Sequence, residues 1–250
     1  MPNRDTRSFI WRLTAEFVVI VVGVLVALGV DSWATRQRER AQEAEYLARL
    51  LDDVQFDLQE LAQVDSVSRV GADASRRLAD AAALDSMSSS RIAAAVIVAQ
   101  SVRLPDLSRS TFEELINSGQ IELIRSDTVR RALASYHRTI SEVAGGWNLY
   151  APGLAAWYAA RIPNRVYERF DQTDGCIQGA EAVYRFPVIC DFDLGGWSTE
   201  RLEADLRSRS GQEVFQMAEH NYEAHTFFTD LLLGEARKLE RVLIGAVSRD

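Results

Sequence analysis

Two histidines and two glutamates near the C-terminus, between Glu219 and His225, are the residues best suited to binding a metal ion. His220 and Glu223 are three positions apart, so on a helix they would share one face and present two ligands to the same ion. His225 lies five residues after His220 and would point partly aside. A helical di-iron site needs two Glu-x-x-His motifs, and the sequence contains none. We keep His220 and Glu223 as metal candidates, interpret the histidines as ordinary surface or core residues, and expect no cofactor.

A polar site around the turn at Gly119 is the second candidate. Glu113, Glu114 and Arg125 flank this turn and together could contact a small ligand. Residues of this kind more often form ion pairs at the surface. Ser110 and Glu113 also match a capping box, in which two side chains cap the start of a helix. We expect a short helix here, ended by Gly119 in a left-handed conformation.

Aromatic side chains crowd the segment beside Pro152 and Gly153. Trp147, Tyr150 and Trp157 could line a ligand pocket or a partner surface. Packing in the core around a kinked helix explains them better. The sequence has neither a glycine-rich phosphate loop nor a nucleophilic serine elbow. We therefore expect that the chain is not an enzyme.

An apolar run near the N-terminus is the element that positions the rest of the chain. The segment Phe17 to Val30 carries no charge and no hydrogen-bonding side chain. A bilayer core of about 30 Å needs about 20 apolar residues in a helix. The longer segment from Trp11 to Trp33 covers about 33 Å, and indole rings favour the headgroup level at both ends. The sequence thus predicts an N-terminal tail over 1–8, a transmembrane helix over 9–33 and a helical soluble domain over 34–250.

Polar and small residues inside the span refine this prediction. Arg12 and Glu16 lie four positions apart and would pair on one helical face near the interface. Gly23 and Ala27 form a small-xxx-small step, which would let a second membrane helix approach closely. A cleaved secretory signal is the alternative interpretation. Glu16 at the start of the apolar core and Trp33 at its end favour an uncleaved signal-anchor.

The charges beside the span do not orient it, because three arginines precede it and three follow it. The only two cysteines, Cys176 and Cys190, fall in a segment over about 162–197 where prolines and glycines predict irregular structure. An exporting compartment would oxidise such a pair to a disulfide, and two unrelated reduced thiols are the alternative. We expect a single-pass protein of the bacterial inner membrane with a periplasmic soluble domain.

Length and charge limit what the soluble part can do. The chain of 250 residues, less its anchor, is long enough for one domain with its own core. The net charge is −8, and because residues 1–40 contribute +2, the remainder carries −10. Binding to nucleic acid demands clustered positive charge, so we exclude nucleic acid as a partner.

Strong helix formers continue from the anchor with no proline or glycine as far as Val70. We expect this helix to end near Gly71, before a second helical stretch over 72–84. The acidic residues of the long helix, Asp57 among them, are interpreted as its solvated face. Five aliphatic residues spaced 4-3-4-3 would either pack inside a bundle or form an assembly seam with a second copy. They are Leu47, Leu51, Val54, Leu58 and Leu61.

Later periodic segments predict further helices. They span 92–104, 111–118, 127 to about 161 with an internal break, a segment that begins at 198, and 212–246. The fold class predicted is all-α, with one N-terminal transmembrane helix that continues into a long helix, followed by an antiparallel helical bundle.

Two blocks of the sequence resemble an uncharacterised family of bacterial single-pass membrane proteins, a domain of unknown function. The first is an apolar helix led by glutamate that ends in an Asx-x-Trp step and runs into a Tyr-Leu-x-x-Leu pattern. The second is TFEELINSGQIELIR. Together they cover about a quarter of the chain, and Gly29 departs from the polar residue that the family tends to carry. The resemblance implies an anchor and a helical domain, without an activity. The matching positions are Glu16, Asp31, Trp33, Tyr46, Leu47 and Leu50, then Phe112, Glu114, Leu115, Ser118, Gly119, Leu123, Ile124 and Arg125.

Two functions of different classes fit these features. One is a membrane-anchored interaction or scaffold protein of the bacterial envelope, bound to the bilayer and to a protein partner or a second copy. The other is a sensory module that binds a small ligand and signals through a partner protein. A large dry cavity would favour the sensory module, and an exposed apolar patch would favour assembly.

Overall fold

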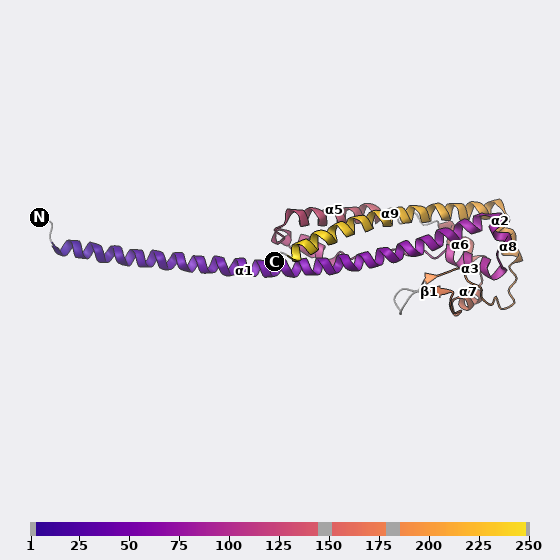
Figure 1. Ribbon diagram of the computed structural model, residues 1–250, viewed down its shortest axis with the longest axis horizontal. Coiled ribbons are helices and arrows are strands. Elements are labelled where there is room, and N and C mark those ends of the chain that lie inside the picture. The colour runs from indigo at the N-terminus through magenta and orange to yellow at the C-terminus, as the bar shows by residue number, and fades with distance from the viewer. Residues whose placement is uncertain (1–3, 145–151, 179–185, 249–250) are drawn as a thin grey trace.

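The first helix dominates the architecture. The structure, a computed structural model, describes residues 4–144, 152–178 and 186–248. Helix α1 (Arg4–Ala79) contains 76 residues without a break, which corresponds to a length of about 114 Å. Its N-terminal part projects alone, and its C-terminal part is one wall of a helical bundle (Figure 1). The all-α prediction is confirmed, since apart from two short strands the regular elements of the described part are helices.

Gly71 does not end the first helix, so that boundary prediction is wrong. A methyl group added at Gly71 would overlap the ring of Tyr222 on the last helix. The hydroxyl of Tyr222 in turn donates a hydrogen bond to the carbonyl of Ala99, at 3.0 Å. Glycine is therefore placed here because it lets two helices approach closely, and helix packing offsets its poor helix propensity.

Two long helices pack along the C-terminal part of α1. Helix α9 (Arg209–Val247) runs back toward the N-terminal side and is antiparallel to α1. Helix α5 (Asp127–Ala144) lies beside both and runs in the direction of α1. Their facing side chains form a core that buries Leu47, Val54, Leu61, Leu133, Tyr136, Leu232, Leu239 and Leu243, among others.

The heptad residues of α1 belong to this core. Leu47, Val54 and Leu61 are at most 2% exposed, and Leu51 and Leu58 pack against the same cluster. Their prediction as an assembly seam for a second copy is therefore wrong, because the chain's own α5 and α9 already cover them. The alternative, packing inside a bundle, is what the structure has.

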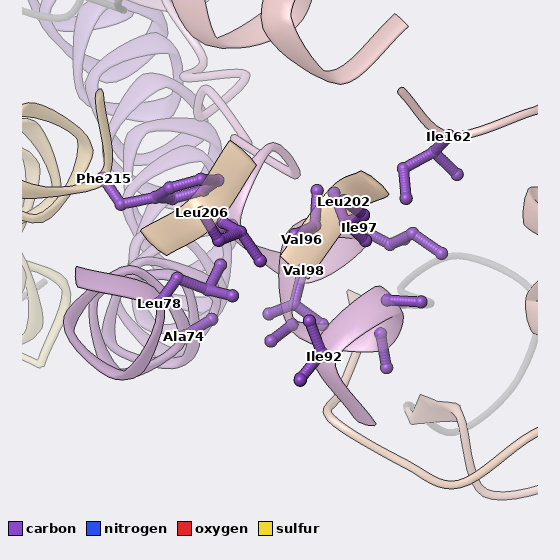
Figure 2. Close-up of a cluster of buried hydrophobic side chains, with 14 of the residues drawn as sticks. Ala74, Leu78, Ile92, Val96, Ile97, Val98, Ile162, Leu202, Leu206 and Phe215 are labelled. Atoms are coloured by element: carbon purple, nitrogen blue, oxygen red, sulfur yellow. The ribbon is translucent and has the colours of Figure 1, made fainter. Parts of the chain in front are cut away.

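A second core fills the end of the bundle farthest from the N-terminus (Figure 1), and Figure 2 shows part of it. Helix α3 (Ser89–Ala99) is its centre, since every residue from Ile92 to Ala99 is at most 2% exposed. It ends before the predicted residue 104, and a segment without helix or strand, 100–109, follows. Around it lie α2 (Ala81–Asp85), α6 (Pro152–Ala159), α7 (Asn164–Asp171) and α8 (Glu200–Arg207). Helix α7 falls in the segment predicted to be irregular.

Short elements complete the chain. Helix α4 (Ser110–Asn117) starts without a side-chain cap, so the predicted capping box does not form. Gly119 has φ 70°, as predicted, and precedes a short 3-10 helix, η1 (Gln120–Leu123). Strands β1 (Ile177–Gln178) and β2 (Phe186–Pro187) pair antiparallel, with Ile177 opposite Pro187.

Candidate functional site

The apolar run is exposed along α1 and makes it long and apolar enough to cross a membrane. Phe17 is 67% exposed, Val30 60% and Trp33 64%. Free exposure of so many large apolar side chains is unfavourable in water, since each buried one contributes about 1.5–3 kcal/mol. Gly23 and Ala27 are also exposed. The side chains of Trp11 and Glu16 lie outside the described residues.

Glu114 and Arg125 do not form one site, because each pairs with a different residue of α1. Arg49 binds Glu114 at 2.5 Å, and Tyr46 directs its hydroxyl toward the same carboxylate. The Arg49 guanidinium, with help from Tyr46, lowers the pKa of Glu114, whereas the hydrogen bond to Glu114 raises the pKa of Tyr46. These exposed pairs fix α4 on α1 rather than surround a ligand.

Arg125 is held by Glu43, a residue that the sequence analysis did not single out. The backbone N–H of Arg125 donates to Glu43 at 2.7 Å, and its guanidinium lies 3.3 Å from the same carboxylate. Glu43 is only 7% exposed, so the two contacts compensate for its burial. Its position one turn before Leu47, on the buried face of α1, could have predicted that Glu43 is buried.

The aromatic segment is part of the core where the structure describes it. Trp157 is 9% exposed and packs edge to face on Phe215, with ring centroids 5.1 Å apart. The guanidinium of Arg161 covers its other side, 4.2 Å from the ring centroid. Trp147 and Tyr150 lie outside the described residues, so the predicted ligand or partner surface has only Trp157 within them, and that residue is buried.

The metal candidates His220 and Glu223 are exposed on α9. No group of three or more potential metal ligands occurs among the described residues. His225 is instead 2% exposed, and neither of its ring nitrogens has a hydrogen-bond partner in the described part of the chain. Burial lowers the pKa of this imidazole, which favours the neutral form.

A buried carboxylate in the middle of α1 was missed by the sequence analysis. Asp57 is 1% exposed, so its interpretation as part of a solvated face is wrong. It accepts hydrogen bonds from the N–H of Ser108 and the hydroxyl of Tyr136, both at 2.7 Å. Burial raises its pKa to about 6, although these hydrogen bonds act in the opposite direction. Asp57 lies three residues after Val54 and four before Leu61, which are both buried, and this helical spacing could have predicted its burial.

The same stretch of α1 holds the segment 100–109 at a second point. Glu60 is 2% exposed and binds Arg103 at 2.9 Å. Together with the bond from Ser108 to Asp57, this pair fastens the segment along α1 between helices α3 and α4. The two buried acids therefore have a structural use, because each binds a donor from this segment.

Cys176 and Cys190 form a disulfide, with Cα atoms 5.2 Å apart. Cys176 is fully buried and belongs to the distal core. The bond closes a loop that contains both short strands, and the N–H of Val188 donates to the carbonyl of Cys176 at 2.8 Å. The disulfide thus joins two parts of this segment at a point where both cysteines pack against the second core.

Among the residues that the structure describes, three surface cavities lie at the end of the bundle nearest the projecting helix. One of about 420 Å³ is bordered by Glu43, Leu47 and Arg125, and another of about 460 Å³ by Gln42, Gly119 and Leu123, among others. The third, about 710 Å³, lies between α5 and α9. Their walls carry many exposed side chains, so they are open grooves.

Comparison of the chain with family models, curated proteins and solved structures finds no match. The resemblance of the two sequence blocks to an uncharacterised family of membrane proteins therefore stays a prediction. The features that bear on function are the exposed apolar part of α1, the bundle and its surfaces.

Proposed function

We propose that the protein is a single-pass membrane protein that holds a helical interaction domain beside the bilayer, as a scaffold or assembly component of the bacterial envelope. The observation that carries this proposal is the continuity of α1. Its exposed apolar part and its buried bundle part belong to one unbroken helix, so an anchor in the bilayer would fix the whole domain. Catalysis has no place in the proposal, because the buried acids Asp57 and Glu60 are engaged in holding segment 100–109.

An exposed apolar stripe on α9 supports an interaction role. Met217, Phe227 and Leu231 are 61%, 66% and 45% exposed, and helical periodicity places them within about a quarter of the helix circumference. Large apolar side chains gathered on one exposed face mark partner surfaces more often than scattered ones do. The stripe lies roughly opposite the buried residues of α9, so a partner could reach it while the bundle stays intact.

The sensory alternative has less support. A small-molecule sensor buries most of its ligand in an enclosed pocket. The three cavities described above are open grooves bordered by charged side chains, which suit a macromolecular partner better.

For the location, we propose the inner membrane with a periplasmic bundle. The disulfide between Cys176 and Cys190 supports this placement, because such bonds persist in the periplasm and are reduced in the cytosol. Labelling of intact cells with an impermeant thiol reagent tests it. Labelling that needs prior treatment with an impermeant reductant is expected. Labelling that occurs only after lysis and needs no reductant would overturn the periplasmic orientation.

Photocrosslinking in cells tests the interaction role. A photoreactive amino acid replaces Phe227 in the stripe, and the control carries it at Arg237, which is exposed on α9 about 15 Å further along and outside the stripe. We expect a discrete protein adduct from position 227 and a much weaker one from position 237. Adducts to lipid alone, or equal adducts at both positions, would refute an interaction role for the stripe. Alkaline carbonate extraction of the same membranes tests the anchor separately.

A further inference from the structure

Two of the grooves join into one channel along the membrane-proximal end of the bundle. The cavity of about 420 Å³ lies among α1, α9 and the start of α5, and the cavity of about 710 Å³ continues between α5 and α9. Thr128 and Val242 border both of them, so the two are contiguous. We call the joined cavity the α5–α9 groove.

The α5–α9 groove is lined by cations in a chain whose net charge is −8. The residues that border the two cavities include five cations and a single carboxylate, Glu43. Such clustering against the overall charge gives the groove a local positive potential, which screening confines to about 10 Å. The cations are Arg125, Arg131, Arg138, Lys238 and Arg241.

Most of these cations are not used by the fold. Arg125 pairs with Glu43, and Lys238 lies 3.7 Å from Glu235. Arg131, Arg138 and Arg241 make no hydrogen bond or ion pair with the residues that the structure describes. Elsewhere on the bundle many arginines meet a carboxylate, at 2.5 Å for the pair of α1 and α4 and at 2.7 Å for a pair of α1 and α9.

Two acids next to the groove, Asp127 and Glu235, already have partners. Asp127 pairs with Arg130 one turn further along α5. Glu235 accepts a hydrogen bond from the hydroxyl of Ser135 at 3.1 Å, in addition to its contact with Lys238. These acids reduce the positive potential of the groove, and they leave its three unpaired arginines available to an anion.

The length of the groove selects among anions. The residues that line it on α5 run from Thr128 to Arg138, ten positions or about 15 Å of helix. A phosphate ion would fill a small part of that length, whereas an extended peptide of four or five residues spans it at about 3.3 Å per residue. Leu47, Ala132 and Val242 add an apolar floor that a peptide's side chains can cover.

We propose that the α5–α9 groove binds an acidic peptide segment of a partner protein, whose carboxylates pair with Arg131, Arg138 and Arg241. This inference rests on the proposed interaction role and names the chemistry of one contact. Guanidinium groups suit it because they bind carboxylates through two parallel hydrogen bonds.

Fluorescence anisotropy with the full chain in phosphatidylcholine nanodiscs tests this proposal. The probe is a fluorescein-labelled octapeptide of alternating glutamate and leucine. We expect saturable binding that weakens about tenfold between 50 and 300 mM NaCl, because surface charges are screened. The double variant Arg131→Gln/Arg241→Gln should bind at least tenfold more weakly. The matched control, Arg165→Gln/Arg201→Gln, changes two exposed arginines outside the groove and should bind as the wild type does.

Two results would overturn the proposal. One is equal binding by the groove variant and the wild type, and the other is equally tight binding of the octapeptide with lysine in place of glutamate. Binding of phosphatidylglycerol vesicles through the same arginines, without the acidic peptide, would also refute it and assign the groove to lipid. If the peptide does not bind but crosslinks at position 227 still form, the groove proposal is refuted and the interaction role of the stripe stands. If the peptide binds but no crosslinks form at position 227, the interaction role of the stripe is refuted and the groove proposal stands.

Discussion

The buried carboxylate of Asp57 makes a pH-dependent contribution to folding that can be measured on its own. Its folded-state pKa is about 6, against an ordinary value of 3.8, because burial disfavours the charged form. A raised pKa means that the folded state holds the proton more tightly than the unfolded state does. The contribution of Asp57 to stability is therefore greatest below about pH 4, and it is lost as the pH rises through 6.

The magnitude follows from the two pKa values. One pH unit of difference corresponds to about 1.4 kcal/mol, so the rise from 3.8 to about 6 amounts to about 3 kcal/mol between pH 3 and pH 8. Asp57→Asn removes the titration and keeps one oxygen, which can accept from the N–H of Ser108, while its new NH2 group can donate to the hydroxyl oxygen of Tyr136. The free energy of unfolding of the wild type minus that of the variant should thus fall by about 3 kcal/mol across this range.

The assay is urea unfolding followed by circular dichroism, with the full chain in detergent at several pH values. Asp52→Asn is the matched control, since Asp52 is exposed on the same helix, and its difference from the wild type should stay nearly constant. Tyr136→Phe removes one of the two donors at Asp57 and should steepen the pH dependence at a cost of about 1–2 kcal/mol. A difference for Asp57→Asn that is constant, or that grows with pH, would refute the assignment of Asp57 as a desolvated acid.

Three further perturbations test other parts of the structure. Gly71→Ala should lower the free energy of unfolding by about 1–3 kcal/mol, because the added methyl group meets Tyr222. The control Gly234→Ala, at an open position on α9, should raise it by about 0.5–1 kcal/mol. Equal effects of the two substitutions in urea unfolding would contradict the close packing at Gly71. Cys190→Ser should cost about 3 kcal/mol and make the melting temperature insensitive to reductant, while the wild type responds to it. Leu25→Arg places a charge in the exposed apolar run at a cost of about 2.5–3.5 kcal/mol for insertion, so the carbonate-resistant fraction should fall; an unchanged fraction would argue against the anchor.

Much of the helical architecture follows from patterns that are local in the sequence. The heptad spacing of Leu47, Val54 and Leu61 predicted the buried face of α1, and the periodic residues of 212–246 predicted α9. Apolar periodicity is visible within a few helical turns, so it predicts the buried face of a helix even when the partner helix is unknown.

The failures have a common cause in tertiary contacts. Gly71 was predicted to end the helix because Tyr222, the residue that it contacts, is more than a hundred residues away in the sequence. Asp57 looked solvated because its donor Tyr136 lies on another helix, 79 residues away. The α5–α9 groove could not be predicted for the same reason, since four of its five cations come from α5 and α9 and become neighbours only when the two helices pack.

The unbroken course of α1 makes the protein a lever if its apolar part is embedded as proposed. From Trp33 at the interface to Ala79 at the far end of the helix there are 46 residues, which span about 69 Å. Membrane helices tilt by about 20° on average, and such a tilt would carry the tip of α1 sideways by about 24 Å. A change in membrane thickness would change the tilt of the embedded helix. Because no loop lies between the bilayer and the bundle, this change in tilt would move the far, disulfide-containing end of the bundle sideways.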